Sequence, residues 1–439
     1  MRGRLLFLAF LVVFFTTNVA FGETFNVTTP EEFQNALTIA QSNGEDDIIN
    51  VAAGTYNITS TLTYSTNNGD SGHTLTIQGA GADQTVLDGG GSVRILYIDT
   101  GADDSGGDVT IKGMAFENGN ANQFHGGAIR FLCNDANMTI ENNTFLGNSA
   151  YSGGAVDASA GSGTKIINNK FIENSAIDIG GACSVHGGAI IKNNTFLSNC
   201  ARCGGGMEIW SGTVTITNNA FSQNCATDIG GGVYVYSSKA IITNNTFSGN
   251  SADEGGGVYA DAVYGTATIT NNTFSGNLAD NYGGGVYGML YHEIDILNVY
   301  NNILFDNAAG AGGNDGDDLY IEIGYKGATV NLYNNDFSGN ADFDTGQSED
   351  LYIDCTDKYH HAGNIQEDPQ FVDPVNGDFH IKPTSSCIDK GNNSAPELPS
   401  TDFEGNPRII NGTVDIGTDE YRNPVCGRAM PWLHLLLVE

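Results

Sequence analysis

Apolar and polar residues alternate along most of this chain, in short runs separated by turns rich in glycine and asparagine. Val233-Tyr234-Val235-Tyr236 and Ala267-Thr268-Ile269-Thr270 are two such runs. A two-residue period is typical of a β-strand with one face buried. From about 75 to 355 we find no convincing helical stripe. The pattern therefore predicts many short strands joined by tight turns.

A repeat sets the spacing of these strands. The motif Asn-Asn-x-Phe returns every 25 to 27 residues, another Asn follows three residues after each Phe, and Gly-Gly-(Ala/Gly)-apolar lies between successive motifs. The phenylalanines of the regular copies are Phe145, Phe171, Phe196, Phe221, Phe247 and Phe274. Longer versions end at Phe305 and Phe337. One repeat matches one coil of a parallel β-helix, whereas a leucine-rich repeat would need leucines that are missing here and a propeller blade is usually longer.

The fold class predicted is all-β, a parallel β-helix with 25 to 27 residues per coil. Asparagine suits this repeat because it tolerates left-handed turns and its amide can bond to the same amide one coil away. For that reason the Asn-x-Thr/Ser triplets are equally well explained as turn residues, and we do not expect glycans.

The two ends of the chain differ from the repeats. Arg2 and Arg4, an apolar run from Leu5 to Phe15 and the small-x-small site Ala20-Phe21-Gly22 predict an export signal over 1–22. The alternative, a retained membrane anchor, would need a longer apolar run. We expect an N-terminal cap and first coil over 23–74, β-helix repeats over 75–362, a closing segment over 363–422 and an unassigned tail or remnant sorting signal over 423–439.

A short helix is expected at the start of the mature chain. Thr29-Pro30-Glu31-Glu32 combines a capping hydroxyl, a first-turn proline and two acids. The apolar face that would cover the open end of the first coil is formed by Phe33, Ala36, Leu37 and Ala40.

The charge balance narrows the range of partners. With 17 Lys+Arg against 51 Asp+Glu, the formal net charge is −34. An acidic surface repels nucleic acid and anionic lipid, so we expect neither as a partner. It favours multivalent cations and neutral or basic partners instead. We expect a monomer without a transmembrane span in the mature chain.

Aligning the coils on the Gly-Gly pair separates inward from outward residues, because successive strand side chains point to opposite faces. The first outward column is Arg130, Asp157, Ser184, Glu208, Tyr234, Tyr259, Tyr287, Tyr320 and Tyr352. A second outward column, two residues further, contains His186, Trp210, Tyr236, Asp261, Met289 and Glu322.

The aromatic residues of these columns have two interpretations. Tyrosine suits an exposed strand and stacks on its neighbour for ~0.2–1 kcal/mol per pair. Alternatively, the residues form an aromatic track that binds sugar rings, for which the acidic surface favours a neutral polysaccharide. The candidate ligand-binding residues are Trp210, Tyr234, Tyr236, Tyr259, Tyr287, Tyr320 and Tyr352.

The polar residues at one end of the two outward columns are the candidates for a catalytic site. Arg130, Asp157, His186 and Glu208 lie on successive coils of one face. A polysaccharide lyase needs a base and a cation, and a glycoside hydrolase needs two carboxylates about 5–9.5 Å apart, such as Asp157 and Glu208. The stronger interpretation is a group of ordinary exposed charges, because the Asp-Asp, Gly-His-Gly and Arg-Ile-Lys signatures of polygalacturonase-like hydrolases are missing from the sequence.

Two later coils share an acidic pattern. Asp317 and Asp318 would stack on Glu349 and Asp350 one coil away. Like charges at this spacing are unfavourable unless a hard cation lies between them or water screens them. Two interpretations of these acidic residues are possible: they bind a structural calcium ion, or they lie in solvated turns. We favour the solvated turns.

Eight cysteines in an exported chain indicate disulfides. Cys200 and Cys225 follow the Phe-x-x-Asn motif in consecutive coils, about one strand spacing apart, so we predict that they are bonded. Cys183–Cys203 is a possible second pair and Cys355–Cys387 a weaker third. A zinc site formed by Cys183, Cys200, Cys203 and Cys225 is the less favoured alternative.

Two stretches resemble known families. The Gly-Gly-Ala-Ile/Val and Phe-x-x-Asn repeats from about 116 to 340 are similar to the passenger repeats of polymorphic outer-membrane proteins, within the pectate-lyase-like superfamily of right-handed β-helices. Asp368-Pro369-Gln370-Phe371-Val372-Asp373, Gly377-Asp378-Phe379-His380-Ile381, Cys387-Ile388-Asp389-Lys390-Gly391 and Asp402-Phe403-Glu404-Gly405-Asn406-Pro407-Arg408 resemble the closing segment of "choice-of-anchor Q" surface proteins. The resemblance implies that the parallel β-helix is right-handed and that the chain is a secreted or cell-surface protein of a bacterial or archaeal envelope.

Together these observations predict an exported, non-catalytic protein for adhesion or carbohydrate binding through the aromatic column. The alternative is a polysaccharide lyase or glycoside hydrolase acting along the same face.

Overall fold

The structure is a computed structural model, and it describes residues 22–66, 70, 72–101, 107–133, 136–161, 163–310, 315–325, 327–354 and 358–422. The expected export signal, the tail over 423–439 and Cys355 lie outside these residues, with Gly22 as the first described position.

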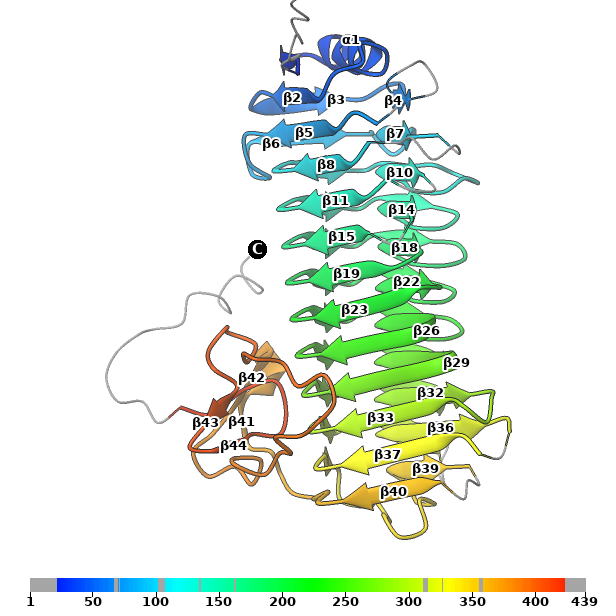
Figure 1. Ribbon diagram of the computed structural model, residues 1–439, viewed down its shortest axis with the longest axis vertical. Coiled ribbons are helices and arrows are strands. Elements are labelled where there is room, and N and C mark those ends of the chain that lie inside the picture. The colour runs from blue at the N-terminus through cyan, green and yellow to red at the C-terminus, as the bar shows by residue number, and fades with distance from the viewer. Residues whose placement is uncertain are drawn as a thin grey trace, which may run out of the picture.

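The described chain winds into a parallel β-solenoid, with each coil stacked on the one before it (Figure 1). Equivalent residues pair in register from coil to coil, for example Phe145 with Phe171 and Phe171 with Phe196. The all-β parallel β-helix predicted from the repeat is thus confirmed. In one longer repeat the position of the expected phenylalanine differs, because Phe274 pairs with Leu304, and Phe305 packs against an apolar cluster that includes residues of the closing segment.

One sheet of 22 strands forms two stretches of every coil. Its strands are β1 (Thr24–Val27), β2 (Asp47–Val51), β4 (Leu62–Ser65), β5 (Leu75–Gly79), β7 (Leu96–Asp99), β8 (Val109–Lys112), β10 (Ile129–Leu132), β11 (Met138–Glu141), β14 (Val156–Ser159), β15 (Thr164–Ile167), β18 (Cys183–His186), β19 (Ala189–Lys192), β22 (Met207–Trp210), β23 (Thr213–Thr217), β26 (Val233–Thr243), β29 (Val258–Thr270), β32 (Val286–Leu290), β33 (Ile296–Tyr300), β36 (Leu319–Ile323), β37 (Thr329–Tyr333), β39 (Leu351–Ile353) and β40 (Tyr359–Ala362).

Two further parallel sheets complete the coils. The 11-stranded sheet holds β3 (Gly54–Asn57), β6 (Thr85–Asp88), β9 (Ala115–Glu117), β12 (Thr144–Leu146), β16 (Lys170–Ile172), β20 (Thr195–Leu197), β24 (Ala220–Ser222), β27 (Thr246–Ser248), β30 (Thr273–Ser275), β34 (Ile303–Phe305) and β38 (Asp336–Phe337). The 7-stranded sheet holds β13 (Ser149–Ala150), β17 (Ser175–Ala176), β21 (Cys200–Ala201), β25 (Cys225–Ala226), β28 (Ser251–Glu254), β31 (Leu278–Tyr282) and β35 (Ala308–Ala309).

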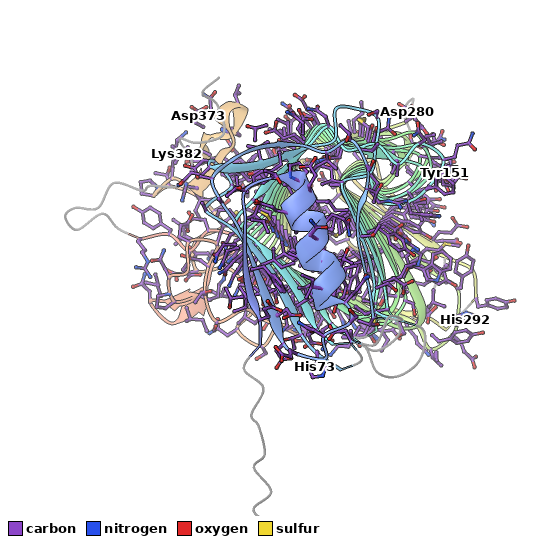
Figure 2. The ribbon with its side chains drawn as sticks, turned by 90° about the horizontal axis from the view of Figure 1, so that it is seen from above. His73, Tyr151, Asp280, His292, Asp373 and Lys382 are labelled. Atoms are coloured by element: carbon purple, nitrogen blue, oxygen red, sulfur yellow. A yellow bond between two sulfur atoms is a disulfide. The ribbon has the colours of Figure 1, made fainter. Side chains whose placement is uncertain are left out.

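The helix α1 (Pro30–Ala40) covers the first coil (Figures 1 and 2). Thr29 caps it by accepting a hydrogen bond from the Glu32 backbone N–H at 3.2 Å. Its buried residues are the expected Phe33, Ala36, Leu37 and Ala40. Sealing this end keeps the unpaired edge of the first coil away from other chains.

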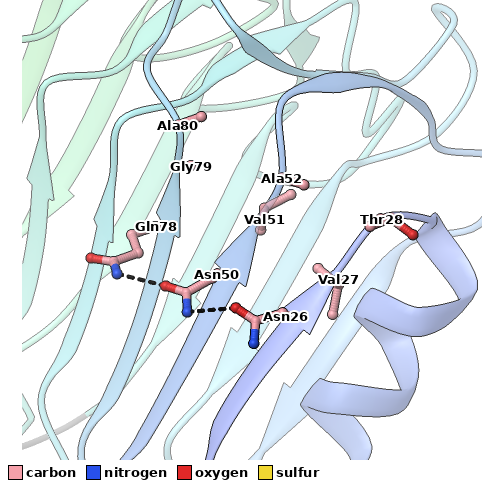
Figure 3. Close-up of a pocket in the computed structure, with 9 residues that line it drawn as sticks. All are labelled: Asn26, Val27, Thr28, Asn50, Val51, Ala52, Gln78, Gly79 and Ala80. Carbon is pink, nitrogen blue, oxygen red and sulfur yellow. Dashed lines mark hydrogen bonds between the residues drawn. The ribbon is translucent and has the colours of Figure 1, made fainter.

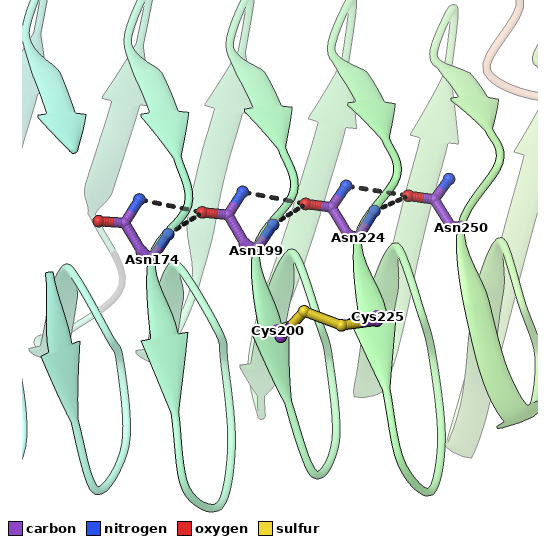
Figure 4. The surroundings of a disulfide bond; sticks show 6 residues. All are labelled: Asn174, Asn199, Cys200, Asn224, Cys225 and Asn250. Carbon is purple, nitrogen blue, oxygen red and sulfur yellow. Dashed lines mark hydrogen bonds between the residues drawn. A yellow bond between two sulfur atoms is a disulfide. The ribbon is translucent and has the colours of Figure 1, made fainter. Parts of the chain in front are cut away.

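Columns of identical residues hold the solenoid core together. The repeat phenylalanines stack with ring centroids 4.6–5.0 Å apart, from Phe116 to Phe274. Two buried asparagine ladders run beside them. In each ladder the side-chain amide donates to the side-chain carbonyl of the next coil, as in Asn199 to Asn224 at 2.9 Å (Figure 4). These amides satisfy one another in the interior, so the polar column costs little to bury.

The first asparagine of each Asn-Asn pair has a different role. At Asn244, Asn271, Asn301 and Asn334 the backbone has φ near 55°, a left-handed turn that asparagine tolerates. These side chains point outward and bind the closing segment, since the Asn271 amide donates to the carbonyls of Asp415 and Gly417 at 3.0 Å. The repeat motif therefore supplies both the inner ladder and an outer docking column.

The closing segment folds back beside the later coils, where Figure 1 shows β41 to β44 in orange and red. It contains two antiparallel pairs, β41 (Phe371–Asp373) with β42 (Asp378–Ile381), and β43 (Ile409–Ile410) with β44 (Thr413–Val414), and a 3₁₀ turn at Pro374–Asn376. Among the described residues, no helix has the length and apolar character that crossing a bilayer would require.

Candidate functional site

The first outward column is in register over nine coils of the 22-stranded sheet. Arg130 pairs with Asp157, Glu208 with Tyr234, and Tyr320 with Tyr352. The alternation in the sequence therefore assigned these side chains to the correct face.

Outward does not mean exposed at this face, however. In three coils the residue before the glycine pair covers the first outward residue of the next coil: His125 contacts Asp157, Ile229 packs against the cluster of Tyr259 and Tyr287, and Tyr282 contacts Tyr320. The glycines allow this approach, because at Gly153 the backbone has φ 60° and a Cβ would lie 2.3 Å from the Val156 carbonyl oxygen.

The tyrosine column is consequently part of the protein interior. Tyr259 is 9% and Tyr287 2% exposed, and their rings stack at 4.6 Å. The stack continues from Tyr287 to Tyr320 at 5.1 Å and from Tyr320 to Tyr352 at 4.8 Å. The expectation of one open aromatic track is wrong for Tyr259 and Tyr287, because the turn of the preceding coil covers them and their ring faces contact each other.

Trp210 and Tyr236, in the second outward column, form the accessible aromatic pair. Their rings stack at 4.2 Å, and Trp210 is 44% exposed. One face of the indole contacts Tyr236; among the described residues, no aromatic ring stacks on its other face. His186 lies in register with Trp210 on the preceding coil, so the 44% of Trp210 that is exposed is the part that a flat ligand could contact.

Further aromatic side chains lie beyond this pair, at positions that the repeat pattern did not single out. Tyr264 stacks on His292 at 3.6 Å, and Tyr264, Tyr291 and Tyr325 are 65%, 42% and 64% exposed. Figure 2 shows His292 at the outer margin of the molecule. The signal in the sequence was a bulky residue beside glycine, as in Tyr264-Gly265, which the structure places at an irregularity within β29. We call Trp210, Tyr236, Tyr264, Tyr291, His292 and Tyr325 the aromatic rim.

Arg130 and Asp157, at the polar end, neutralise each other. The guanidinium of Arg130 forms an ion pair with Asp157, and His125 Nδ1 lies 3.2 Å from the second carboxylate oxygen. Asp157 is completely buried, and burial lowers the pKa of Arg130 to about 10. The expectation that Asp157 is an exposed charge is therefore wrong, because His125 and Arg130 cover it.

Glu208 lies in a similarly closed environment. Its Oε2 accepts a hydrogen bond from the Ser184 hydroxyl at 2.9 Å, and Ser184 Oγ lies 3.3 Å from His186 Nε2. Its other oxygen is buried without a hydrogen-bond partner, and burial raises the pKa of Glu208 to about 7. Glu208, too, is buried rather than exposed as expected. Burial lowers the pKa of His186, so this imidazole favours its neutral form.

Asp261, which the sequence placed in the second column without a role, is a further buried carboxylate. It is 7% exposed, Oδ1 has no hydrogen-bond partner, and burial raises its pKa to about 7. It pairs in register with Tyr236 at the end of the accessible aromatic pair.

The four carboxylates considered for calcium contact donors of their own chain. Asp318 Oδ1 accepts from the Asn307 amide at 2.8 Å and thereby ends one asparagine ladder, while Oδ2 accepts from the Ser338 N–H at 2.8 Å. Asp317 accepts from the Ala309 N–H at 2.7 Å, and Glu349 from the Asn340 amide at 3.0 Å. Asp350 accepts from the Asn340 N–H. Calcium binding here stays a prediction.

The predicted Cys200–Cys225 disulfide is present, with Cα atoms 4.6 Å apart (Figure 4). This bond argues against the four-cysteine zinc alternative. Cys183 and Cys203 are both buried and free, so the second suggested pair is not formed. Cys183 points into the core, whereas the Cys203 sulfur lies 3.7 Å from Asp228 Oδ2. Cys387 is free as well, and its sulfur contacts Asp336 Oδ2 at 3.1 Å.

Two hollows on the surface are shallow. One, of about 260 Å³, lies along Asn26, Asn50 and Gln78, whose amides bond to one another at 3.0 and 2.6 Å (Figure 3). The other, of about 360 Å³, lies between the solenoid at Asn244 and the closing segment at 397–401. Neither hollow adjoins Glu208 or the aromatic rim.

Known proteins resemble this chain in its repeats. The family model described as "Right handed beta helix region" matches residues 182–357, and the model described as "Periplasmic copper-binding protein (NosD)" matches residues 57–255. These matches support a right-handed helix and an exported protein. No curated protein matches the sequence.

Some solved structures resemble this chain at low sequence identity and with TM-scores below 0.5. Alginate lyase AlyF-OU02 in complex with G6 is 16% identical over 78% of this chain and 72% of that chain, with a TM-score of 0.40. A PL6 alginate lyase in complex with a trisaccharide is 15% identical over 82% and 81%, also at 0.40. A PL6 family polysaccharide lyase from Pseudopedobacter saltans is 13% identical over 90% and 99%, at 0.37. These likenesses carry no inference about activity.

The copper named in one family description can be tested against the residues. Within the described part of 57–255, no three His, Cys, Asp or Glu side chains bring ligand atoms together. Cys200 and Cys225 are bonded to each other, and Cys183 is enclosed in the core. The described residues of the coils matched by that family model therefore do not fit a copper site built from these residue types.

Proposed function

We propose that this protein is an exported, non-catalytic β-helix that binds a neutral polysaccharide of a cell surface through its aromatic rim. The observation that carries the proposal is the stacked Trp210–Tyr236 pair, whose tryptophan is 44% exposed and which is accompanied by further exposed tyrosines. Aromatic rings with one apolar face and a polar edge are suited to contacts with sugars. A net charge of −34 disfavours acidic glycans at the same surface.

The buried state of the polar column supports a non-catalytic role. A general acid or base must come within hydrogen-bond reach of the atom whose proton it transfers. Asp157 and Glu208 have no exposed surface, and Asp157 already forms an ion pair with Arg130 and contacts His125. The alternative, a polysaccharide lyase or glycoside hydrolase using Arg130, Asp157, His186 and Glu208, would require the covering turns to open.

Affinity electrophoresis against a panel of neutral and acidic glycans tests the proposal. We expect a neutral glycan to retard the wild type, and expect retardation to fall at least about tenfold in Trp210→Ala and Tyr236→Ala. The matched control is Tyr300→Ala. Tyr300, at the end of β33, stacks on Tyr333 of β37 with ring centroids 5.1 Å apart and does not belong to the aromatic rim. Equal retardation of all variants, or of none, contradicts the assignment to the rim.

The same incubations separate binding from catalysis. New reducing or unsaturated ends that disappear in Asp157→Ala or Glu208→Ala would establish the enzymatic alternative. Circular dichroism spectra of each variant show whether the solenoid is intact, so a loss of products through misfolding is recognised.

A further inference from the structure

The closing segment brings a histidine and two carboxylates together from three separate stretches of the chain. His380 lies on β42, Glu404 in the turn after Asp402, and Asp419 near the end of the described residues. One potential ligand atom of each lies within 4.8 Å of the others. His380 Nε2 is 2.7 Å from Glu404 Oε1.

Asp378 orients this imidazole from its other side. The Nδ1 atom of His380 contacts the Asp378 carboxylate, and the Asp378 oxygen also accepts the His380 backbone N–H at 3.2 Å. With Nδ1–H donated to Asp378, the Nε2 atom can bind a proton that it shares with Glu404 Oε1, or a metal ion that replaces this proton. In metalloproteins this arrangement fixes the tautomer and orientation of a metal-binding histidine.

The local charge favours a cation at this position. Over 363–422 the sequence has 4 basic and 11 acidic residues, a balance of −7. Arg408 is buried here, but its guanidinium donates to the carbonyl oxygens of Gly417 at 3.1 Å and Thr418 at 3.0 Å. Asp419 is only 9% exposed, and its Oδ2 accepts a hydrogen bond from the Ile381 N–H at 2.9 Å.

We propose that His380, Glu404 and Asp419 form a binding site for a divalent first-row transition metal, with Zn²⁺ as the expected ion and Asp378 as the positioning residue. One imidazole nitrogen and two carboxylate oxygens are ligands that Zn²⁺ accepts, with a water molecule completing four-coordination. Ca²⁺ and Mg²⁺ prefer oxygen ligands alone, so the imidazole discriminates against them.

A metal here would connect the parts of the closing segment that dock on the solenoid. The β41–β42 hairpin carries His380, and the stretches around Glu404 and Asp419 contain Thr401 and Thr418, which contact Asn244 and Thr273 of the coils. Binding a metal in the folded state but not in the unfolded chain stabilises the folded state. The site is independent of the aromatic rim and of the proposed glycan binding.

Titration of the metal-stripped full chain with Zn²⁺ in a calorimeter tests the site. We expect one strong site per chain and a rise in melting temperature. His380→Ala should abolish that site, and Asp378→Asn should weaken it by about 10–100-fold. The matched control is His73→Ala, which removes a histidine that also faces a carboxylate, 3.7 Å from Asp46 at the other end of the solenoid.

If His380→Ala does not fold, two further measurements still test the metal site. Glu404→Gln retains a hydrogen-bonding group beside His380 but should still lose Zn²⁺ affinity. Co²⁺ bound in place of Zn²⁺ should give visible absorption that changes in Glu404→Gln and not in His73→Ala. Undiminished Zn²⁺ binding by Glu404→Gln and His380→Ala, no binding by the wild type, or equal stabilisation by Ca²⁺ would each overturn the proposal.

Discussion

The buried carboxyl group of Glu208 should make the stability of this protein depend on pH. Glu208 has no exposed surface, one of its oxygens is without a hydrogen-bond partner, and burial raises its pKa from 4.5 to about 7. In the unfolded chain the carboxyl group titrates near its usual value. Between these two pKa values the folded protein keeps a proton that the unfolded chain has lost.

The direction and size of the effect follow from this difference. Because the folded state binds the extra proton, the stability that Glu208 contributes is fully present below about pH 4.5. It falls by about 1.4 kcal/mol per pH unit through the window and is lost above about pH 7. The pKa difference corresponds to roughly 3 kcal/mol between pH 4 and pH 8. Glu208→Gln removes the titration while keeping the shape of the side chain.

Urea unfolding of wild type and Glu208→Gln at pH 4 and pH 8 measures the effect. We expect the wild type to lose roughly 3 kcal/mol relative to the variant over this range. Glu173→Gln is the matched control, because Glu173 is exposed in the equivalent turn where Gln223 stands two coils later, with nearly the same φ of 54° and 55°. A difference in unfolding free energy between wild type and Glu208→Gln that stays constant from pH 4 to pH 8 would refute the reasoning.

The structure of the coils leads to three further predictions about the stability of the protein. Asn199→Ala should lower the free energy of unfolding by about 3–5 kcal/mol, since it removes four buried hydrogen bonds: two that Asn199 Oδ1 accepts from the backbone N–H and side-chain amide of Asn174, and two that the Asn199 amide donates to the Phe171 carbonyl and to Asn224 Oδ1; urea unfolding measures this. Cys225→Ser should cost about 3 kcal/mol by freeing a 25-residue loop in the unfolded chain, seen as a lower melting temperature that reductant does not change further. Titrating the metal-stripped protein with Ca²⁺ should leave its melting temperature constant, since Asp317, Asp318, Glu349 and Asp350 already accept hydrogen bonds from N–H groups of the chain. A rise in melting temperature that is lost when these carboxylates are replaced would establish the calcium site.

The repeat allowed the coil architecture to be predicted because its information is local. Asn-Asn-x-Phe contains an outward left-handed turn, an inward amide and an inward ring within four residues, so one motif determines the path of one corner. The pairing of Cys200 with Cys225 followed for the same reason, since residues one repeat apart lie one strand spacing apart. The place of Phe305 was missed because the repeat there is longer and Leu304 takes the inner position.

The contacts within the closing segment could not be predicted from its sequence, because they depend on the three-dimensional path of the chain. His380, Glu404 and Asp419 are separated by 24 and 15 residues without any repeat, and the Arg408 side chain reaches Asn244 on a distant coil. The motif around His380 suggested a family resemblance and gave no indication that these side chains converge.

The exposure of side chains at the candidate site depends on the turns between strands, which the alternation of apolar and polar residues does not describe. Alternation distinguishes the two faces of a strand, but the turn before each glycine pair decides whether an outward side chain meets water. With φ of 66° at Gly126 and 67° at Gly230, that turn places His125 against Asp157 and Ile229 against the cluster of Tyr259 and Tyr287. From Tyr259 to Tyr352 the tyrosines of the column stack face to face, whereas Tyr264, at an irregularity within β29 where φ is 54°, is 65% exposed. The accessible aromatic surface therefore consists of the aromatic rim, and the column of stacked tyrosines strengthens the solenoid.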